Sequence, residues 1–205
     1  MWINSRIDRI INKIVNGITT YYNVARLKSN GVKIGKHPRF CGILHYKIDK
    51  NSQLSIGNNC IIVSGGYRNG FGRNLHSSIT IYGNGHLDIG DNVRMSDVAI
   101  SCRQHIRIGN FVMIGGDVLI FDSNAHSLQW KERRDETPIP KHGTIKHSDI
   151  IIDDDVFIGA RSIITKGVHI GARSIIATGS VVTRNIPSDE IWGGNPAKFI
   201  KKIKY

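Results

Sequence analysis

The sequence repeats an aliphatic residue at intervals of six. The repeat is most regular in IIDDDVFIGARSIITKGVHIGARSIIATGSVV, which runs from Ile151 to Val182. The aliphatic positions that share this spacing are Ile152, Ile158, Ile164, Ile170, Ile176 and Val182. A helix would repeat its apolar face every three or four residues, and a single strand every two. A period of six therefore predicts short strands that each turn one aliphatic side chain inward, with a tight turn after each.

The same register extends over most of the chain. A second run consists of Ile108, Ile114 and Ile120, and looser copies such as LSIGNNCII and LDIGDNVRM precede it. Small residues, many of them glycine, occupy the positions where the chain must turn. Separate short strands in a sandwich or barrel would not need so constant a spacing. We therefore predict an all-β solenoid, a parallel β-helix over residues 31–186, in which each coil buries its apolar face on the next.

Residues 1–30 have a different pattern. Their aliphatic residues follow helical spacing, with basic and polar residues between them: Ile3, Ile7, Ile10, Ile11, Ile14, Val15 and Ile18. This pattern predicts an amphipathic helix. The expected role is a cap whose isoleucine stripe packs on the end of the solenoid. The alternative is a helix that lies on a membrane surface, with its basic residues toward lipid headgroups.

Two further segments depart from the repeat. The register stops at Ile120 and resumes at Ile152, so residues of about 122–149 should form a projecting loop. A long loop inside a compact fold usually carries function. Residues 187–205 contain Pro187 and Pro196 and end in AKFIKKIKY. We expect this last segment to be a short C-terminal helix or tail.

Composition narrows the classes of function. The chain has 205 residues, of which 40% are hydrophobic, and a formal net charge of +12. It lacks the continuous apolar core of a signal peptide and an apolar run of about 20 residues that could span a membrane. Its three cysteines form no CxxC pair. We therefore expect a cytoplasmic protein with reduced thiols. No nucleic-acid motif accompanies the basic residues. A polyphosphate ligand or anionic lipid remains as the partner of the basic surface.

One histidine is placed for catalysis. His126 follows the last regular coil in IFDSNAHS, where the loop departs. A rigid scaffold would hold it there while the loop gives access. Because imidazole titrates near neutral pH, His126 could act as a general base for a hydroxyl nucleophile. A solvated loop histidine is the alternative.

The repeat, the late loop with Asp-x-x-x-His and the ending GSVVTRNIP…GGNPAKFIKKI together resemble the left-handed β-helix acyltransferases. Within this family the chain is most similar to the sugar O-acetyltransferases of bacterial surface-polysaccharide biosynthesis, from about Gly31 to Ile203. Two positions depart from the usual pattern: Phe157 stands where many members have Trp, and Ser127 where a proline often follows the histidine.

The resemblance implies a left-handed solenoid, a homotrimer with its active site between adjacent solenoids, and acetyl-CoA as acyl donor. It implies His126 as the catalytic base and Asp122 as the acidic residue of the loop motif. The family's CoA contacts match Gly159, Ala160, Ala177, Thr178, Arg184 and Lys198. The small turn residues also have a steric explanation, because only small side chains fit a tight corner. No metal is implied.

The acceptor is implied only as a sugar or glycan hydroxyl, in capsule or lipopolysaccharide synthesis at the inner membrane surface. Asn124 and Trp130 are its candidate contacts in the loop. A rival interpretation is a metal lyase like the gamma carbonic anhydrases, with His105, His142 and His147 as ligands. A scaffold without catalytic activity is the third possibility, because fold alone does not fix function.

Overall fold

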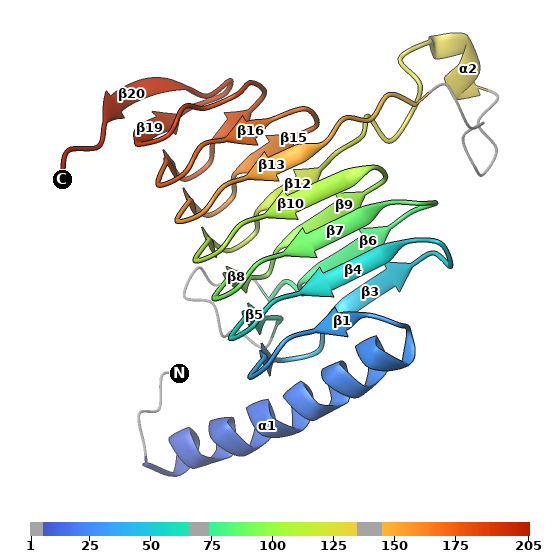
Figure 1. Cartoon of the computed structure of the whole chain (residues 1–205), viewed down its shortest axis with the longest axis vertical. Coiled ribbons are helices and arrows are strands. Elements are labelled where there is room, and N and C mark those ends of the chain that lie inside the picture. The colour runs from blue at the N-terminus through green and yellow to red at the C-terminus, as the bar shows by residue number, and fades with distance from the viewer. Residues whose placement is uncertain (1–5, 66–73, 135–144) are drawn as a thin grey trace.

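The computed structural model describes residues 6–65, 74–134 and 145–205. Short strands wind into a left-handed parallel β-helix whose coils stack along the long axis of the molecule (Figure 1). Successive strands enter three different sheets in turn, so that each coil adds one strand to each sheet. The predicted solenoid is confirmed.

The three sheets form the walls of the solenoid. The first, sheet A, contains β1 (Lys33–Ile34), β4 (Gln53–Ile56), β7 (His86–Ile89), β10 (His105–Ile108), β13 (Ile150–Ile152) and β16 (His169–Ile170). Sheet B contains β2 (Arg39–Cys41), β5 (Ile61–Val63), β8 (Arg94–Ser96), β11 (Met113–Ile114), β14 (Phe157–Ile158), β17 (Ile175–Ile176), β19 (Glu190–Gly193) and β20 (Lys198–Lys202). Sheet C contains β3 (His45–Ile48), β6 (Ser78–Ile81), β9 (Ala99–Cys102), β12 (Leu119–Phe121), β15 (Ile163–Thr165) and β18 (Val181–Val182).

The six-residue repeat places one aliphatic side chain on each wall. Three repeats make one coil, so Ile152 pairs in register with Ile170 on the next coil. The same stacking holds on the other walls, where Ile158 pairs with Ile176 and Ile164 with Val182. These side chains are fully buried and join one continuous core. Burial of stacked aliphatic groups is the main favourable term that holds the coils together.

The corner between sheets A and B is held by a polar ladder along the axis. The side-chain oxygen of Asn58 accepts a hydrogen bond from the backbone N–H of Lys36 (2.8 Å). Asp91 accepts in the same way from Asn58 (2.7 Å), and Asn110 from Asp91 (2.9 Å). Asp154 extends the ladder to Asn110 (2.7 Å). Each side chain thus satisfies a backbone donor that the turn leaves without a strand partner.

The N-terminal helix α1 (Arg6–Ser29) lies across the lower end of the solenoid (Figure 1). Its polar side chains contact the first coil: the hydroxyl of Thr19 donates to the carbonyl of Phe40 (2.6 Å), and Thr20 accepts from the Phe40 N–H (2.9 Å). Asn23 donates to the carbonyl of Gly42 (2.9 Å) and accepts from the N–H of Leu44 (3.0 Å).

These hydrogen bonds replace those that a preceding coil would make to β2, whose edge would otherwise be unpaired. The helix covers the end of the solenoid, as expected. The expectation that its isoleucine stripe packs on the core is wrong, because Ile10, Ile14 and Ile18 are all exposed. The polar face contacts the first coil instead, with Asn23 buried and Thr19 and Thr20 half-buried, since the end of a β-helix presents backbone groups that need polar partners.

The C-terminal segment also differs from the expected short helix or tail. It forms β19, which extends sheet B, and β20, which pairs with β19 in the antiparallel direction. The hydroxyl of Tyr205 donates to Asp189 (2.9 Å), and Arg173 forms an ion pair with the same carboxylate (2.6 Å). In the part of the chain that the structure describes, no helix is long and apolar enough to cross a bilayer.

Candidate active site

The loop that interrupts the repeat leaves the solenoid after β12, at the corner between sheets C and A. Its two ends are joined at the base: the N–H of Asn124 donates to the carbonyl of Lys146 (3.0 Å), and the N–H of Ser148 donates to that of Asp122 (2.9 Å). Ser123 and His147 form an antiparallel bridge between them. The loop therefore departs from a fixed point, and it holds α2 (Trp130–Arg134) away from the coils (Figure 1).

Asp122 is fully buried at this corner. Its carboxylate accepts hydrogen bonds from the backbone N–H groups of Arg103 (2.8 Å) and Gln104 (2.7 Å), which belong to the preceding turn of the solenoid. Burial, and then the nearby Asp122 charge, raise the pKa of the Cys102 thiol. The described contacts of Asp122 hold the corner together, and a contact that orients His126 stays a prediction.

His126 lies just beyond the fixed base, with its side chain exposed. Its backbone N–H donates to the carbonyl of Asn124 (2.7 Å). The next residue, Ser127, is buried and lies just before α2: its hydroxyl accepts from the N–H of Gln129 (3.1 Å) and bonds to the Glu132 carboxylate. His126 is thus held between two anchored positions while its imidazole stays accessible, as a general base requires.

Trp130, one of the two candidate acceptor contacts, lies on α2 with half of its surface exposed. The guanidinium of Arg134 lies 4.5 Å from the ring centroid and the ammonium of Lys131 5.5 Å. These cation–π contacts place two positive charges against the indole ring. Asn124, the other candidate, is half-buried at the loop base. Contact of either residue with a sugar stays a prediction.

The four turn residues proposed for CoA lie on one corner, between sheets B and C, on two adjacent coils. Gly159 and Ala160 follow β14, and Ala177 and Thr178 follow β17. The N–H of Gly159 donates to the carbonyl of Ile176 (2.8 Å). A Cβ atom on Gly159 would lie only 2.6 Å from the backbone nitrogen of Thr178, so the steric explanation for this glycine holds. We call these four residues the turn column.

The two basic residues expected near CoA lie at different corners. Lys198 pairs with Gly193, and a Cβ on Gly193 would contact the methyl group of Ala177 at 2.9 Å, so Lys198 lies beside the turn column. Arg184 follows β18 at the corner between sheets C and A, the side on which the loop departs. On one solenoid, a strand of sheet C, about 10 Å long, separates the two sides.

A pocket at the C-terminal end was not predicted from the sequence. It has a volume of about 610 Å³, with Ile175 and Ile191 on its floor and Lys201, Lys202 and Lys204 among its walls. The β19–β20 pair places Lys201 and Lys202 on the edge strand of sheet B, in register with β19. The segment KFIKKIK does not alternate between apolar and polar residues, so the sequence carried little signal for this strand, and it was interpreted as a short helix or tail.

The three histidines of the metal-lyase interpretation have different surroundings. His105 pairs with Asp88 (3.0 Å), and Nδ1 of His147 lies 3.1 Å from the carbonyl oxygen of Ile145. His142 lies outside the described residues. Among the residues that the structure describes, no three His, Cys, Asp or Glu side chains form a group that could hold a metal ion.

Comparison with known proteins places this chain among hexapeptide-repeat proteins. The family described as the hexapeptide repeat of succinyl-transferase matches residues 149–184. A galactoside O-acetyltransferase of Lactococcus lactis is 32% identical over 72% of this chain, which spans 62% of that protein's length. The Escherichia coli protein WbbJ, whose name assigns it to O-acetyl transfer in lipopolysaccharide biosynthesis, is 28% identical over 85% of this chain and 95% of its own length.

A solved structure shows the same fold. It is the complex of AntD, an N-acyltransferase from Bacillus cereus, with dTDP and 3-hydroxybutyryl-CoA. It superimposes with a TM-score of 0.66 over 88% of each chain, at 22% sequence identity. This likeness establishes the solenoid architecture.

Proposed function

We propose that this chain, which carries the hexapeptide repeat of the acyltransferase family, transfers an acetyl group from acetyl-CoA to a sugar hydroxyl in bacterial capsule or lipopolysaccharide synthesis. The observation that carries this proposal is the exposed His126, fixed at the base of the loop that interrupts the coils. The similarity to WbbJ over nearly the whole of both chains supports a glycan acceptor.

The residues present fit an acyl-CoA. CoA carries a diphosphate and a 3′-phosphate, together with an amide-containing arm that ends in the thioester. Lys198 beside the turn column, and Arg184, can bind phosphate oxygens by charge-assisted hydrogen bonds. The lysine-walled pocket offers apolar side chains for the adenine base of CoA and cations for the CoA phosphates. At the turn column, the small side chains leave room beside the coils for the amide arm.

We place the complete site between two solenoids of a homotrimer. On one chain, His126 and the turn column lie at opposite ends of the sheet C strands, too far apart to act on one thioester. A neighbouring solenoid would bring its turn column to this loop. Exposed apolar side chains on sheet B favour such packing: Met113 and Phe157 pair in register and are 49% and 43% exposed.

In the proposed mechanism His126 accepts the proton of the sugar hydroxyl as its oxygen bonds to the thioester carbonyl carbon. A backbone N–H at the turn column donates to the carbonyl oxygen as negative charge develops there. When the C–S bond breaks, the protonated His126 returns the proton to the leaving thiolate. Asp122 holds the loop base, and with it the place of His126, and it is the candidate group to orient the imidazole.

A cytoplasmic location completes the proposal. The three cysteines, Cys41, Cys60 and Cys102, are free and buried, which suits a reducing compartment. Acetyl-CoA is also a cytoplasmic metabolite, and the growing glycan would be met at the inner membrane surface.

Calorimetric titration with acetyl-CoA tests the donor assignment. We expect micromolar binding by the wild type, by His126→Ala and by metal-stripped protein, because none of these changes removes the turn column or Lys198. Absence of binding, together with loss of stability on chelation, would overturn the proposal. It would favour His105, His142 and His147 as metal ligands instead.

A further inference from the structure

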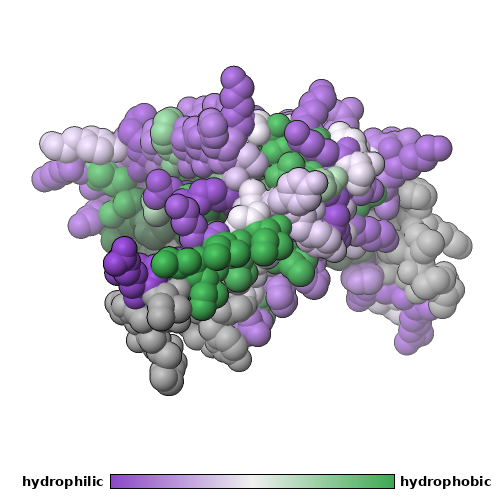
Figure 2. All heavy atoms as spheres, turned by 90° about the horizontal axis from the view of Figure 1, so that it is seen from below, coloured by the Kyte–Doolittle hydropathy of each residue, from purple (hydrophilic) through white to green (hydrophobic). Residues whose placement is uncertain are grey.

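Helix α1 turns its apolar face away from the protein. Six large side chains on this face are between 47% and 79% exposed: Ile10, Ile11, Ile14, Ile18, Tyr21 and Tyr22. They follow one another along the helix and form a continuous apolar band at the lower end of the molecule (Figure 2). We call them the isoleucine–tyrosine face. Exposed bands of this kind mark interaction surfaces, because they gain nothing from contact with water.

Capping does not explain this face. The opposite side of the helix covers the first coil, through hydrogen bonds of Thr19, Thr20 and Asn23. A helix that only closed the solenoid would need polar residues on its outward side as well. Because none of the described residues covers the outward isoleucines, they favour a partner outside the chain.

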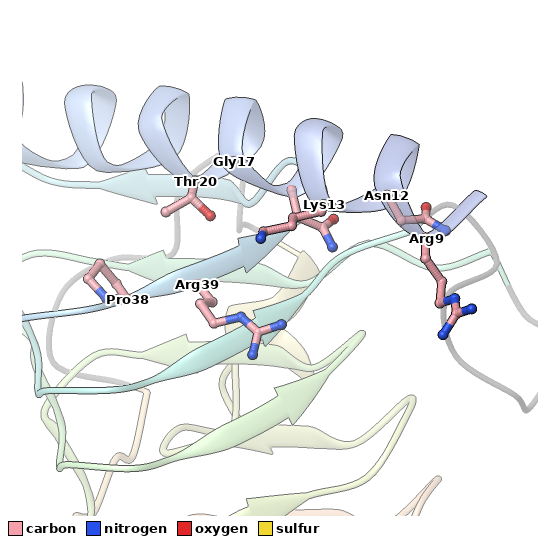
Figure 3. A pocket seen from close by; sticks show the side chains of 8 residues that line it. Arg9, Asn12, Lys13, Gly17, Thr20, Pro38 and Arg39 are labelled. Carbon is pink, nitrogen blue, oxygen red and sulfur yellow. The ribbon is translucent and has the colours of Figure 1, made fainter. Parts of the chain in front are cut away.

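The charge beside this face indicates what that partner is. The sequence of α1 contains five basic residues, Arg6, Arg9, Lys13, Arg26 and Lys28, against one acidic residue, Asp8. Between the helix and β2 lies a pocket of about 610 Å³, and its lining includes Arg9, Lys13 and Arg39 but no acidic residue (Figure 3). The helix thus carries an apolar stripe on its outward side and clustered cations on the side toward β2, an arrangement that matches the boundary between acyl chains and anionic headgroups.

We propose that α1 docks the protein on an anionic phospholipid surface. The isoleucine–tyrosine face enters the boundary between headgroups and acyl chains, where tyrosine is favoured. The cations of the pocket bind headgroup phosphates. A second copy of the chain fits less well, because apposed α1 helices would bring two sets of basic residues together.

Docking would also fix the orientation of the molecule. Because α1 lies across one end of the solenoid, its outward face points along the solenoid axis (Figure 1). The coils would stand upright on the membrane, with the C-terminal coils farthest from it. This inference does not depend on the proposed acetyl transfer, because it concerns the opposite end of the chain.

Vesicle flotation with the full chain tests the inference. The wild type should bind vesicles of phosphatidylcholine with 30% phosphatidylglycerol at least about tenfold more strongly than phosphatidylcholine alone, and high salt should reduce the difference. Ile14→Asp/Ile18→Asp should lower binding by at least about tenfold. The milder Ile14→Ala/Ile18→Ala should lower it less, and it preserves helix propensity. Lys13→Gln/Arg39→Gln should remove most of the preference for phosphatidylglycerol.

Ile200→Asp is the matched control, because Ile200 is 53% exposed at the other end of the molecule. It should bind vesicles as the wild type does, and circular dichroism should show all variants folded. The inference is overturned if the wild type does not float with anionic vesicles, or if Ile200→Asp loses as much binding as the α1 variants. Dissociation of an oligomer by Ile14→Asp/Ile18→Asp, without vesicle binding by the wild type, would identify the face as a contact between copies.

Discussion

At the scale of residues, Asp122 and His126 illustrate two kinds of candidate in one motif. Asp122 is buried and bonded to two backbone N–H groups, whereas His126 is exposed. A buried carboxylate that satisfies backbone donors is costly to remove, because its partners are then left without acceptors. The motif therefore combines a structural anchor with an accessible imidazole, and each can be tested by its own measurement.

Replacing Asp122 with Ala should lower the free energy of unfolding by about 2–4 kcal/mol, because two N–H groups lose their acceptor. Asp122→Asn keeps one acceptor oxygen and should lose less. Urea unfolding measures both variants. Wild-type stability of Asp122→Ala combined with lost turnover would show that the carboxylate acts on the chemistry and does not hold the corner.

Lys198→Gln should weaken acetyl-CoA binding by about tenfold, as expected for loss of one charge-assisted phosphate contact. Calorimetry with S-acetylpantetheine, which lacks the nucleotide and its phosphates, provides the matched ligand. Its affinity should be the same for wild type and variant. An equal loss for both ligands would place Lys198 away from the phosphates.

At the scale of elements, the polar ladder between sheets A and B makes stability depend on pH. The backbone N–H of Asn58, followed by its side-chain amide, lowers the pKa of the Asp91 carboxyl. A carboxyl with a lowered folded-state pKa contributes stability above its unfolded pKa of about 3.9, and this is lost as the pH falls through the folded value. The charge on Asp91 thus favours the folded state at neutral pH.

We therefore expect the unfolding midpoint to decrease as the pH falls from 5 to below 4. Asp91→Asn, which retains an acceptor oxygen but no charge, should make this decrease shallower. Thermal unfolding followed by circular dichroism across this range provides the measurement. An identical pH profile in the variant would show that Asp91 does not contribute.

The sequence predicted best those elements in which the spacing of the aliphatic residues equals the spacing of the buried positions. Ile152, Ile158 and Ile164 recur every six residues because each coil has three walls, so spacing alone identified the fold. Helix α1 was predicted as an element, but its buried face was not. Sequence patterns do not reveal that the first coil presents unpaired backbone groups, which attract Thr19 and Asn23 in place of isoleucine.

For the candidate site, the sequence identified single residues better than their arrangement. The position of His126 followed from where the repeat stops. That Lys198 lies beside the turn column while Arg184 lies at another corner depends on how coils stack and on the β19–β20 pair. Such relations arise from contacts distant in sequence, and one repeat pattern cannot specify them.

At the scale of the whole molecule, the proposed active site requires more than one solenoid. Met113→Asp/Phe157→Asp places two charges on the exposed apolar part of sheet B and should dissociate the proposed trimer. Sedimentation velocity should show trimers for the wild type and monomers for the variant, and turnover should be lost with assembly. A monomeric wild type with full activity would contradict the shared site.

The molecule also separates its proposed tasks along one axis. The α1 end carries the isoleucine–tyrosine face, the middle carries the loop with His126, and the C-terminal coils carry Lys198 and the lysine-walled pocket. A rigid stack of coils keeps these parts at fixed heights, because each coil contacts only its neighbours.

The most direct test of the central claim is the rate of free CoA release from acetyl-CoA with a panel of bacterial capsule and lipopolysaccharide oligosaccharides. Wild type, His126→Ala and the control His147→Ala, an exposed histidine at the same loop base, would be compared. We predict acceptor-dependent release that falls by at least about 10²-fold in His126→Ala alone, with acetyl-CoA affinity unchanged. Near-normal release by His126→Ala would contradict the assignment of the catalytic base, and with it the account of the site.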